Sequence, residues 1–360
     1  MNILITTGHP AQVHNFRELK KELELRGHII YWLATDKDIS KYLLNYYQIE
    51  YTLIKRPPKG IFSKIFNLVN NSIAAIKFIK KNKIDFVVSR IHPAIVLGAF
   101  LTRTRQIGLA DTEISGIYDT IFSKLLGATL TGRSFERTLT KHQIRYNGNI
   151  ELCYLHPNRF VAREHGHSIV GVDSGTPYVI IRFVGWDAYH DKGCNGISSE
   201  GKLRTVQEFS KYAKVFISSE RELPEEFRKY QIKIPFEKMH DALKDAALFY
   251  GESSTMASES AMLGTPAFYI DNSYRGYTNE EKKAGLVWTF NADAKSQVDS
   301  IEYAVQILKD LSPKDKLREK RDLFLKDKID VTAFLVWFIE NYPESKRIMK
   351  ENPDYQYRFK

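Results

Sequence analysis

Short apolar runs alternate with amphipathic segments along the chain. Residues 2–6, NILIT, form a compact apolar run, and four apolar residues then recur at helical spacing, namely Val13, Phe16, Leu19 and Leu23. Gly27 suits the end of that helix, and residues 28–35, HIIYWLAT, form the next apolar run. A buried strand, a helix and another buried strand in this order predict a β-α-β unit of a parallel sheet.

The alternation continues on both sides of one polar interruption. Further strands are expected at the apolar runs 51–54, 84–89, 107–111 and 128–132, and then at 178–184, 214–219, 247–250 and 267–270. The stretch 156–177 is rich in polar residues, proline and glycine, so we place a domain junction there. We therefore predict an α/β protein of two Rossmann-like, doubly wound parallel-sheet domains that face a cleft. The first domain covers residues 1–165 and the second covers residues 166–330.

The composition narrows the class of partner. Of the 360 residues, 43% are hydrophobic and 27% are charged, which is enough apolar material for two packed cores. The net charge of +10 favours acidic partners, namely nucleic acid, anionic lipid or phosphorylated small molecules. Cys153 and Cys194 form neither a metal-spaced pattern nor a disulfide framework, which suits a reducing compartment. The N-terminus lacks signal-peptide features and no run reaches the ~20 apolar residues of a membrane span, so we predict a cytoplasmic protein.

The stretch 251–266, GESSTMASESAMLGTP, places small hydroxyl residues between two apolar strands. Ser253, Ser254 and Thr255 fall at a strand-to-helix turn, and the following residues are helical up to Gly264. The free backbone N–H groups and the dipole of a helix N-terminus attract anions, so this turn predicts a phosphate-binding site. A serine that merely caps the helix is the competing interpretation.

Glu259 lies about one turn further along the same helix. A capping box requires serine or threonine three residues earlier, and Met256 stands there, so capping does not explain this glutamate. A carboxylate beside a phosphate site suits the two hydroxyl donors of a ribose. The competing interpretation is a glutamate that faces solvent.

The segment SSTMASESAMLGTP resembles the nucleotide-diphosphate motif of GT-B glycosyltransferases and of UDP-N-acetylglucosamine 2-epimerases. In the epimerases, a Ser-Gly-Gly turn is followed by a glutamate six residues after the serine and by a closing Leu-Gly-x-Pro. Residues 253–255 match the turn, Glu259 the glutamate and residues 263–266 the close, whereas the two glycines are absent here. The resemblance implies a GT-B fold and a bound nucleotide-diphosphate sugar, with no metal ion or other cofactor.

Seven ordered segments extend the resemblance over most of the chain: GHPAQVHNF, ADTE, KHQIRYNG, ELCYLHPNRF, RFVGWDAYHD, FISSERELP and TMASESAMLGTP. Together they resemble the uncharacterised family called domain of unknown function 354. This resemblance implies a GT-B-like fold without an established reaction. It also implies that the C-terminal helices, residues 331–360, cross back to the first domain.

Four residues of the first domain are candidates for catalysis. His9 and His14 follow the first strand, and the resemblance to GT-B enzymes places this loop at the cleft. Histidine titrates near neutrality, so either can serve as a general base on an acceptor hydroxyl, while a structural role in the loop or helix is the alternative. Asp111 and Glu113 end a strand, where two carboxylates are costly unless solvated, paired or used. Glu113 matches the catalytic glutamate in the His-Val-Glu-Ala-Gly segment of the epimerases, and a helix cap is the alternative.

Three more residues extend the predicted nucleotide site in the second domain. Arg182 interrupts a buried strand and needs an anionic partner, either the diphosphate or a side chain such as Asp187 or Glu220. Ser219 ends another strand, and His240 begins the helix before the serine-rich turn. The segment WDAYHD has the composition of a metal cluster, but the resemblance to GT-B enzymes argues against a metal.

Residues 51–84 contain eight bases and no acid. Five apolar residues recur there at helical spacing: Phe62, Phe66, Val69, Ile73 and Ile76. A basic amphipathic helix can lie on anionic lipid, so residues 61–83 are a candidate for peripheral membrane contact. The competing interpretation is a helix whose apolar stripe packs on the core and whose basic back is solvated.

Together these features predict a GT-B-type glycosyltransferase. It would move a sugar from a nucleotide-diphosphate sugar, for which we expect a UDP-sugar, to a saccharide or lipid-linked acceptor in surface polysaccharide synthesis. A UDP-sugar 2-epimerase is the first alternative, and a non-catalytic binder of sugar nucleotide or nucleic acid is the second. Aromatic residues are not interleaved with the basic run as a stacking platform requires, so no nucleic-acid partner is expected. The expected location is cytoplasmic, with peripheral contact at the inner membrane face through residues 61–83.

Overall fold

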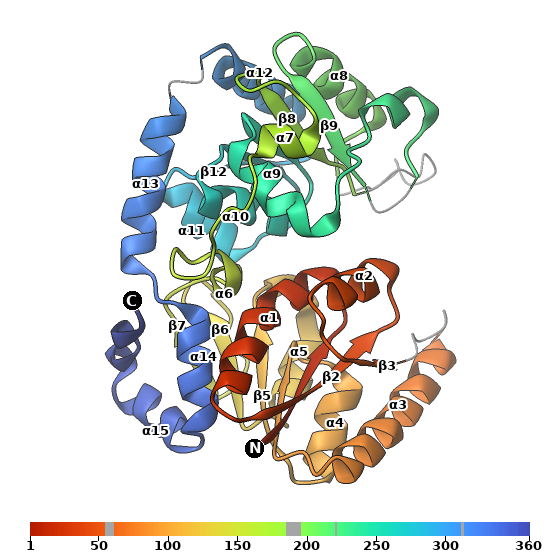
Figure 1. The fold of residues 1–360 in the computed structure, drawn as a ribbon, viewed down its shortest axis with the longest axis vertical. Helices are drawn as coiled ribbons and strands as arrows, with labels where there is room; N and C mark the ends of the chain where they lie inside the picture. The colour runs from red at the N-terminus through yellow and green to blue at the C-terminus, as the bar shows by residue number, and fades with distance from the viewer. Residues whose placement is uncertain (55–60, 185–195, 220–221, 311–312) are drawn as a thin grey trace. The chain divides into compact units, whose positions relative to one another are not determined.

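Two compact α/β units make up the chain. The computed structural model describes residues 1–54, 61–184, 196–219, 222–310 and 313–360. Unit 1 comprises Met1–Arg159 and Lys328–Lys360, and unit 2 comprises Phe160–Asp327. Each unit holds one parallel sheet with helices on both faces (Figure 1). The predicted α/β class with two doubly wound parallel sheets is confirmed.

Unit 1 is built on a parallel sheet that has, in the described residues, seven strands in the order β3-β2-β1-β4-β5-β6-β7. These are β1 (Asn2–Thr7), β2 (Ile29–Thr35), β3 (Thr52–Ile54), β4 (Phe86–Ser89), β5 (Arg105–Ala110), β6 (Ala128–Gly132) and β7 (Gln143–Tyr146). All of β4 and all but the first residue of β1 are buried. Helices cover both faces of a parallel sheet, which is why its central strands are continuous apolar runs in the sequence.

The helices of unit 1 form two layers. They are α1 (Pro10–Leu25), α2 (Asp38–Tyr46), α3 (Ile61–Lys81), α4 (Pro93–Leu101), α5 (Gly116–Ser123), α6 (Leu152–Leu155), α14 (Val331–Glu340) and α15 (Glu344–Glu351), with 3-10 turns η1 (Glu113–Ser115) and η5 (Pro353–Phe359). In one layer α1 packs against α2, α6 and α14; in the other α4 packs against α3 and α5. Right-handed crossovers produce this division, because the chain first adds strands outward from β1 to β3 and then adds β4 to β7 on the opposite side.

Unit 2 repeats the design with a smaller sheet. Its strands β8 (Tyr178–Arg182), β9 (Lys214–Ser218), β10 (Leu248–Gly251), β11 (Ala267–Ile270) and β12 (Val287–Phe290) are in the order β12-β11-β10-β8-β9. Its helices are α7 (Gly166–Val170), α8 (Ser199–Phe209), α9 (Met239–Asp245), α10 (Ser254–Leu263), α11 (Gly276–Lys283), α12 (Ala294–Lys309) and α13 (Pro313–Asp327), with 3-10 turns η3 (Glu225–Tyr230) and η4 (Phe236–Lys238). Helices α8 and α12 pack together in one layer, and α10 packs against α9, α11 and α13 in the other.

Helix ends follow local capping signals. Ser253 caps α10, and Gly264 ends it with a left-handed φ of 78°, as the sequence predicts. Helix α8 begins at Ser199, because the Ser198 hydroxyl accepts the N–H of Gly201 and caps the helix there. Within the part of the chain that the structure describes, no helix combines the length and apolar character needed to cross a membrane.

Each sheet has a topological switch point, where the chain reverses the direction in which it adds strands. In unit 1 this point lies between β1 and β4, and in unit 2 it lies between β8 and β10. Loops that leave the two strands of a switch point diverge to opposite faces, and ligands of open parallel sheets bind beside their carboxyl ends. Ligand-binding and catalytic residues are therefore expected directly after these four strands.

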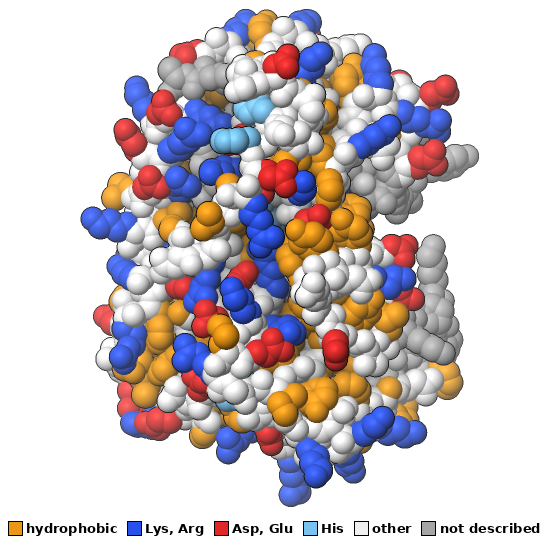
Figure 2. All heavy atoms as spheres, in the orientation of Figure 1, with side chains coloured by type: hydrophobic (Ala, Val, Ile, Leu, Met, Phe, Trp, Pro, Cys, Tyr) orange, Lys and Arg blue, Asp and Glu red, His pale blue; other side chains and the backbone are white. Residues whose placement is uncertain are grey.

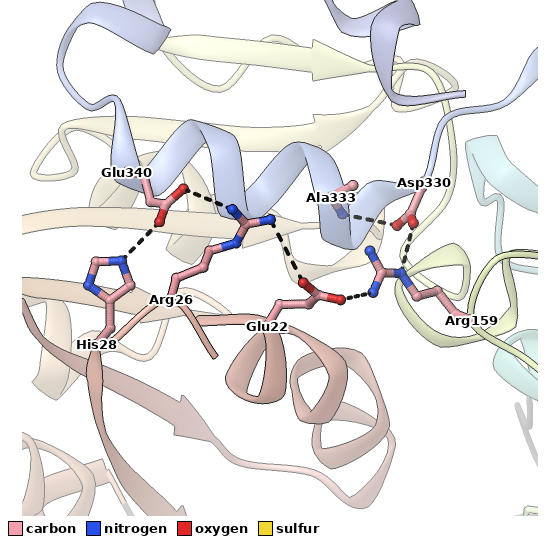
Figure 3. A network of polar contacts seen from close by, with 7 residues as sticks. All are labelled: Glu22, Arg26, His28, Arg159, Asp330, Ala333 and Glu340. Atoms are coloured by element: carbon pink, nitrogen blue, oxygen red, sulfur yellow. Dashed lines mark hydrogen bonds and ion pairs between the residues drawn. The ribbon is translucent and has the colours of Figure 1, made fainter. Parts of the chain in front are cut away.

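The C-terminal segment Lys328–Lys360 belongs to unit 1, where α14 lies along α1 (Figure 3). Arg159 donates from Nε to Asp330 Oδ2 at 2.7 Å and from Nη1 to Glu22 Oε1 at 2.6 Å. Asp330 in turn caps α14 by accepting the N–H of Ala333. The two points at which the chain passes between the units are thereby tied to each other and to α1.

The far end of α14 is held by a second polar group. Glu340 lies 3.1 Å from His28 Nε2, and Arg26 Nη1 lies 3.9 Å from the second carboxylate oxygen (Figure 3). Both partners stand at the junction of α1 and β2. Polar contacts at its two ends therefore align α14 on the N-terminal part of unit 1.

Candidate functional site

The serine-rich turn lies at the carboxyl end of β10, at the switch point of unit 2. β10 ends at Gly251, and the N-cap Ser253 accepts the N–H of Met256 at 3.3 Å. The described residues supply no hydrogen-bond partner for the backbone N–H groups of Ser254 and Thr255. These two donors and the positive end of the helix dipole are therefore available to an anion, even though the serine cap is also present.

Gly251 brings the backbone of β10 close to that of β8. Its φ is 157°, and a Cβ at this position would lie 2.2 Å from the carbonyl oxygen of Arg182. A larger residue would have to push the two strands apart at the switch point. The glycine therefore keeps the turn and Arg182 in register.

Arg182 stands at the end of β8, between the turn and β9. In the sheet it pairs with Gly251 of β10 on one side and with Ser218 of β9 on the other. Its Nη1 donates to the Ser218 hydroxyl at 3.1 Å. The predicted Ser219 follows directly after β9, so the serine that receives this arginine bond is its neighbour. The structure thus brings a guanidinium and a serine pair to the same edge as the serine-rich turn.

Glu252 occupies the turn itself, and the sequence analysis did not single it out. Its Oε2 accepts the N–H of Val184 and its Oε1 accepts the N–H of Ile197, both at 2.6 Å. Two amide donors offset part of the carboxylate charge, so an acid is compatible with an anion site here. The sequence could have indicated this role. Glu252 lies inside a turn that is expected to bind an anion, and a carboxylate there needs hydrogen-bond donors of its own.

His240 and Glu259 form a buried pair between α9 and α10. His240 Nε2 and Glu259 Oε1 are 2.9 Å apart, and their side chains are 5% and 7% exposed. The alternative of a solvent-facing Glu259 is therefore wrong. The sequence treats the two as separate nucleotide contacts, whereas the structure joins them in one hydrogen-bonded unit. Their contact with a nucleotide stays a prediction.

Another arginine of unit 2, Arg275, lies in the loop that follows β11. Arg275 donates from Nη1 to Asp271 Oδ2 at 3.1 Å and to the Ser273 hydroxyl at 2.7 Å, and it also contacts the Tyr269 hydroxyl. Burial raises the pKa of Asp271, but hydrogen bonds from Ser273, Tyr269 and Arg275 outweigh that effect and lower the pKa overall. This arginine, which the sequence analysis missed, orders the loop between β11 and α11.

An ion pair spans the carboxyl edge of unit 1. Arg90 follows β4 and its Nη2 contacts Asp111, which follows β5. Nη1 of Arg90 also donates to Asn15 Oδ1 on α1 at 3.1 Å. Burial lowers the pKa of Arg90, but the adjacent Asp111 more than compensates and raises it overall. The sequence analysis missed Arg90, although FVVSR places a base directly after a buried strand.

Both predicted histidines accept a hydrogen bond at Nδ1. His9 caps α1, because its Nδ1 accepts the N–H two residues further on at 3.3 Å. His14 is buried against the rings of Tyr47 and Tyr154, and Arg17 Nη1 lies 3.4 Å from its Nδ1. Since an arginine can only donate, a neutral ring at either site carries its proton on Nε2. A general-base role, which stays a prediction for both, would have to use this Nδ1 in place of the hydrogen bond that it accepts.

His92 is a histidine of the same edge that the sequence analysis did not select. It precedes α4 as its N-cap residue and stands two residues beyond Arg90, after β4. Its Nδ1 is buried and has no hydrogen-bond partner among the described residues. Burial lowers the pKa of this ring and so favours the neutral form. A neutral imidazole beside a switch point is a candidate general base.

Glu113 begins η1 after β5. Its Oε1 accepts the N–H of Glu136 at 3.2 Å, and its carbonyl oxygen accepts Nη1 of Arg137 at 2.9 Å. These bonds tie the loop after β5 to the loop after β6. The match of Glu113 to the catalytic glutamate of the epimerases stays a prediction.

Some predicted residues lie outside the described part of the chain. These are the WDAYHD segment with Asp187, His190 and Asp191, together with Glu220. Among the residues that the structure describes, no group of three His, Cys, Asp or Glu side chains is placed to hold a metal ion.

Solved structures of nucleotide-sugar enzymes share this architecture. A putative UDP-N-acetylglucosamine 2-epimerase from Listeria monocytogenes has a TM-score of 0.68 at 12% identity, covering 95% of this chain and 96% of that one. The UDP-GlcNAc 2-epimerase from Neisseria meningitidis, solved with UDP-GlcNAc bound, has a TM-score of 0.60 at 13% identity, with coverages of 90% and 100%. MurG from Acinetobacter baumannii has a TM-score of 0.56 at 14% identity, with coverages of 94% and 99%. The chain has a GT-B-like fold.

The similarity to solved structures establishes the GT-B-like fold but not the activity. No family model and no curated protein sequence matches the chain. The resemblance to the family called domain of unknown function 354 therefore stays a prediction carried by sequence segments alone. Because one fold hosts many reactions, the activity has to be argued from the site.

Proposed function

We propose that this GT-B-like protein binds a nucleotide-diphosphate sugar and transfers its sugar to an acceptor. One observation carries the proposal: at the switch point of unit 2, Arg182 ends β8, and the N–H groups of Ser254 and Thr255 begin the helix that follows the adjacent strand β10. A diphosphate presents several charged oxygens, and a guanidinium and the free amides of a helix start are both good donors to such oxygens. The Neisseria epimerase was solved with UDP-GlcNAc bound, which supports the same class of ligand here.

The proposed donor site extends from the phosphates to the ribose. Glu259 lies on α10, one turn beyond the phosphate donors, and is our candidate for the ribose hydroxyls. His240 contacts one oxygen of this carboxylate and fixes its orientation. Ser253 and Ser219 supply further hydroxyls at the same carboxyl edge. We expect uracil as the base, since the Neisseria epimerase was solved with UDP-GlcNAc bound.

Transfer also requires a group that takes the proton of the acceptor hydroxyl. We propose that unit 1 supplies it, with His92 after β4 and His9 after β1 as the candidates on the two sides of its switch point. As the base accepts the proton, the acceptor oxygen bonds to the anomeric carbon. The nucleoside diphosphate leaves with the electron pair of the broken bond, and the donors at the start of α10 stabilise its charge. The proposed acceptor is a saccharide or a lipid-linked sugar of surface polysaccharide synthesis.

A thermal-shift screen with UDP, UDP-GlcNAc and the corresponding thymidine, cytidine and guanosine compounds tests ligand binding. A ligand at 100 times its Kd stabilises the folded state by about 2.7 kcal/mol, which moves the melting temperature by several degrees. We expect the uridine compounds to give the largest shift. The proposal fails if no nucleotide shifts the transition at millimolar concentration.

A UDP-sugar 2-epimerase is the second candidate, and the carboxylates of Asp111 and Glu113 at the end of β5 favour it. Epimerisation removes and returns a proton at one carbon, for which a pair of acid-base groups is suited. Incubating UDP-GlcNAc with the protein alone separates the candidates. An epimerase forms a second UDP-sugar that chromatography resolves, whereas a transferase releases UDP only after an acceptor is added.

Nucleic acid is a poor match to the face of the molecule drawn in Figure 2. On the face drawn in Figure 2, lysine and arginine side chains lie interspersed with acidic ones instead of forming one continuous field. Tracking a phosphate backbone requires a continuous basic stripe. A salt-dependent affinity for DNA or RNA that UDP leaves unchanged would contradict this assignment.

A further inference from the structure

The apolar stripe of α3 faces outward. Phe66, Val69 and Ile73 are 67%, 52% and 46% exposed. The opposite side of the helix packs on α4, and there a Cβ on Gly98 would lie 2.8 Å from Cβ of Ala75. So close an approach admits only a small side chain at position 75, and Phe66, Val69 and Ile73 lie on the other side of the helix. The alternative in which the stripe packs inward is therefore wrong for these three residues.

The same outward face becomes cationic toward the end of the helix. At 100° per residue, Lys77 and Lys80 continue the line of the apolar residues, and Lys81 flanks it. All three lysines are exposed, and none forms an ion pair with a residue that the structure describes. No acid occurs in residues 51–84 to offset this charge. The face is thus apolar in its first half and basic in its second.

A second exposed apolar group stands in the same helical layer. Ile114, Ile117, Tyr118 and Ile121 of η1 and α5 are 52%, 69%, 64% and 48% exposed. Helix α4 packs against both α3 and α5, and α3 lies beside α4 in Figure 1. Helices α3 and α5 follow β3 and β5, so both begin at the carboxyl edge of the parallel sheet. The apolar residues therefore gather toward the edge of the sheet that carries the candidate general bases, His9 and His92.

We infer that this docking surface, made of the outward face of α3 with η1 and α5, binds an anionic lipid bilayer. Large apolar side chains exposed on one layer mark an interaction surface. A bilayer buries such side chains at the boundary of its acyl region, while anionic headgroups attract the adjacent lysines. The consequence that docking presents unit 1 to a lipid-linked acceptor rests on the proposed function. The docking itself does not.

Vesicle co-sedimentation of the full chain tests the inference, using phosphatidylcholine vesicles with and without phosphatidylglycerol. We expect the native protein to bind the anionic vesicles at low salt. Each lysine near such a surface contributes roughly a fivefold factor, so Lys77→Gln/Lys80→Gln/Lys81→Gln should weaken binding about 100-fold. The triple variant Phe66→Ser/Val69→Ser/Ile73→Ser should weaken it by at least roughly tenfold, because it removes the inserted groups.

Matched controls distinguish docking through this surface from nonspecific adsorption to vesicles. Leu25, Val161 and Leu323 are 75%, 79% and 73% exposed and lie outside the docking surface, so changing all three to Ser should leave vesicle binding unchanged. For charge, Lys282→Gln/Lys283→Gln/Lys316→Gln removes three exposed lysines of unit 2 and should change binding only slightly. A control that weakens binding as much as its matched α3 variant overturns the inference.

Two further results would also overturn it. One is a native protein that ignores anionic vesicles at low salt. The other is self-association, seen by sedimentation velocity without lipid and abolished by the Phe66, Val69 and Ile73 variant, because the surface would then belong to a second copy of the chain. The nucleotide screen is independent: a protein that binds vesicles but no nucleotide keeps the docking surface and loses the proposed function.

Discussion

The carboxyl edges of the two sheets occupy the same place in the fold and carry different chemistry. In unit 2 the edge presents donors, namely the Arg182 guanidinium and the N–H groups of Ser254 and Thr255. In unit 1 the corresponding edge presents the mutually paired charges of Arg90 and Asp111, with histidines beside them. The first arrangement suits a fixed anion. The second suits proton transfer at a neutral hydroxyl, because its charges are already matched.

This difference shows that topology selects the position of a site and local side chains select its chemistry. Both edges are switch points of parallel sheets, so both are predisposed to bind ligands. Only in unit 2 does a strand run through a glycine into a helix whose first N–H groups have no described partner. The variants below test whether the two edges are specialised in this way, in order of decreasing expected effect.

Gly251→Ala should have the largest effect. The added Cβ would meet the Arg182 carbonyl oxygen at 2.2 Å, so the two central strands of unit 2 must separate. Strain of this kind costs at least roughly 3 kcal/mol of unfolding free energy and should also abolish nucleotide binding. Urea unfolding and calorimetry measure the two effects. Gly171→Ala is the matched control: its φ is 73° and nothing lies within 4 Å of its Cβ, so it should cost about 1 kcal/mol.

Ser254→Asp should weaken nucleotide binding about 100-fold while preserving the fold. An acid in the first turn of a helix is compatible with the dipole, but its charge repels a diphosphate held by the same N–H groups. Ala294→Asp makes the same charge change at the first residue of α12 and should leave the affinity unchanged. Isothermal calorimetry with UDP distinguishes them, and an unchanged Kd for Ser254→Asp would remove the phosphate assignment.

Arg90→Met should destabilise unit 1 by about 2 kcal/mol without changing nucleotide affinity. It leaves Asp111 unpaired, and the two side chains are only 13% and 21% exposed. The exposed pair of Arg347 and Glu344 offers the comparison: Arg347→Met should change the unfolding free energy far less, because solvent screens an exposed pair. A loss of UDP binding in Arg90→Met would show that the two edges are not specialised.

The smallest effect concerns pH. Burial lowers the pKa of His92 below its ordinary value of 6.5, so below that pH the unfolded chain binds more protons than the folded one. Stability should therefore be complete above about pH 6.5 and fall as the solution becomes more acidic. His92→Gln should reduce this slope in melting temperatures measured from pH 7.5 to 5.5. Some slope should remain, because burial also lowers the pKa of His142 and His156.

Much of the fold could be predicted from the sequence, because the strands, turns and helix ends are determined by neighbouring residues. Continuous apolar runs marked strands that are buried on both faces, and Gly264 ended α10 because only a residue tolerant of left-handed φ suits that position. The serine-rich turn was also predictable, since a strand, hydroxyl residues and a helix follow one another along the chain. Each of these signals lies within roughly 18 consecutive residues and needs no distant partner.

Pairings between distant residues were decided only by the tertiary structure. Arg90 and Asp111 are brought together by the neighbouring strands β4 and β5, and His240 and Glu259 by the packing of α9 on α10. No periodicity encodes these contacts, because each depends on two segments meeting in one register. The sequence could therefore single out Asp111, His240 and Glu259 as candidate site residues without naming their partners.

The helix α3 shows the same division within one element. Its sequence determined that it is a helix with an apolar stripe and a basic end, because spacing alone defines a stripe. Which side faces the core was decided by α4, where Gly98 draws Ala75 so close that only small side chains fit between the helices. Phe66, Val69 and Ile73 were consequently left on the outside, available to a partner that the sequence could only suggest.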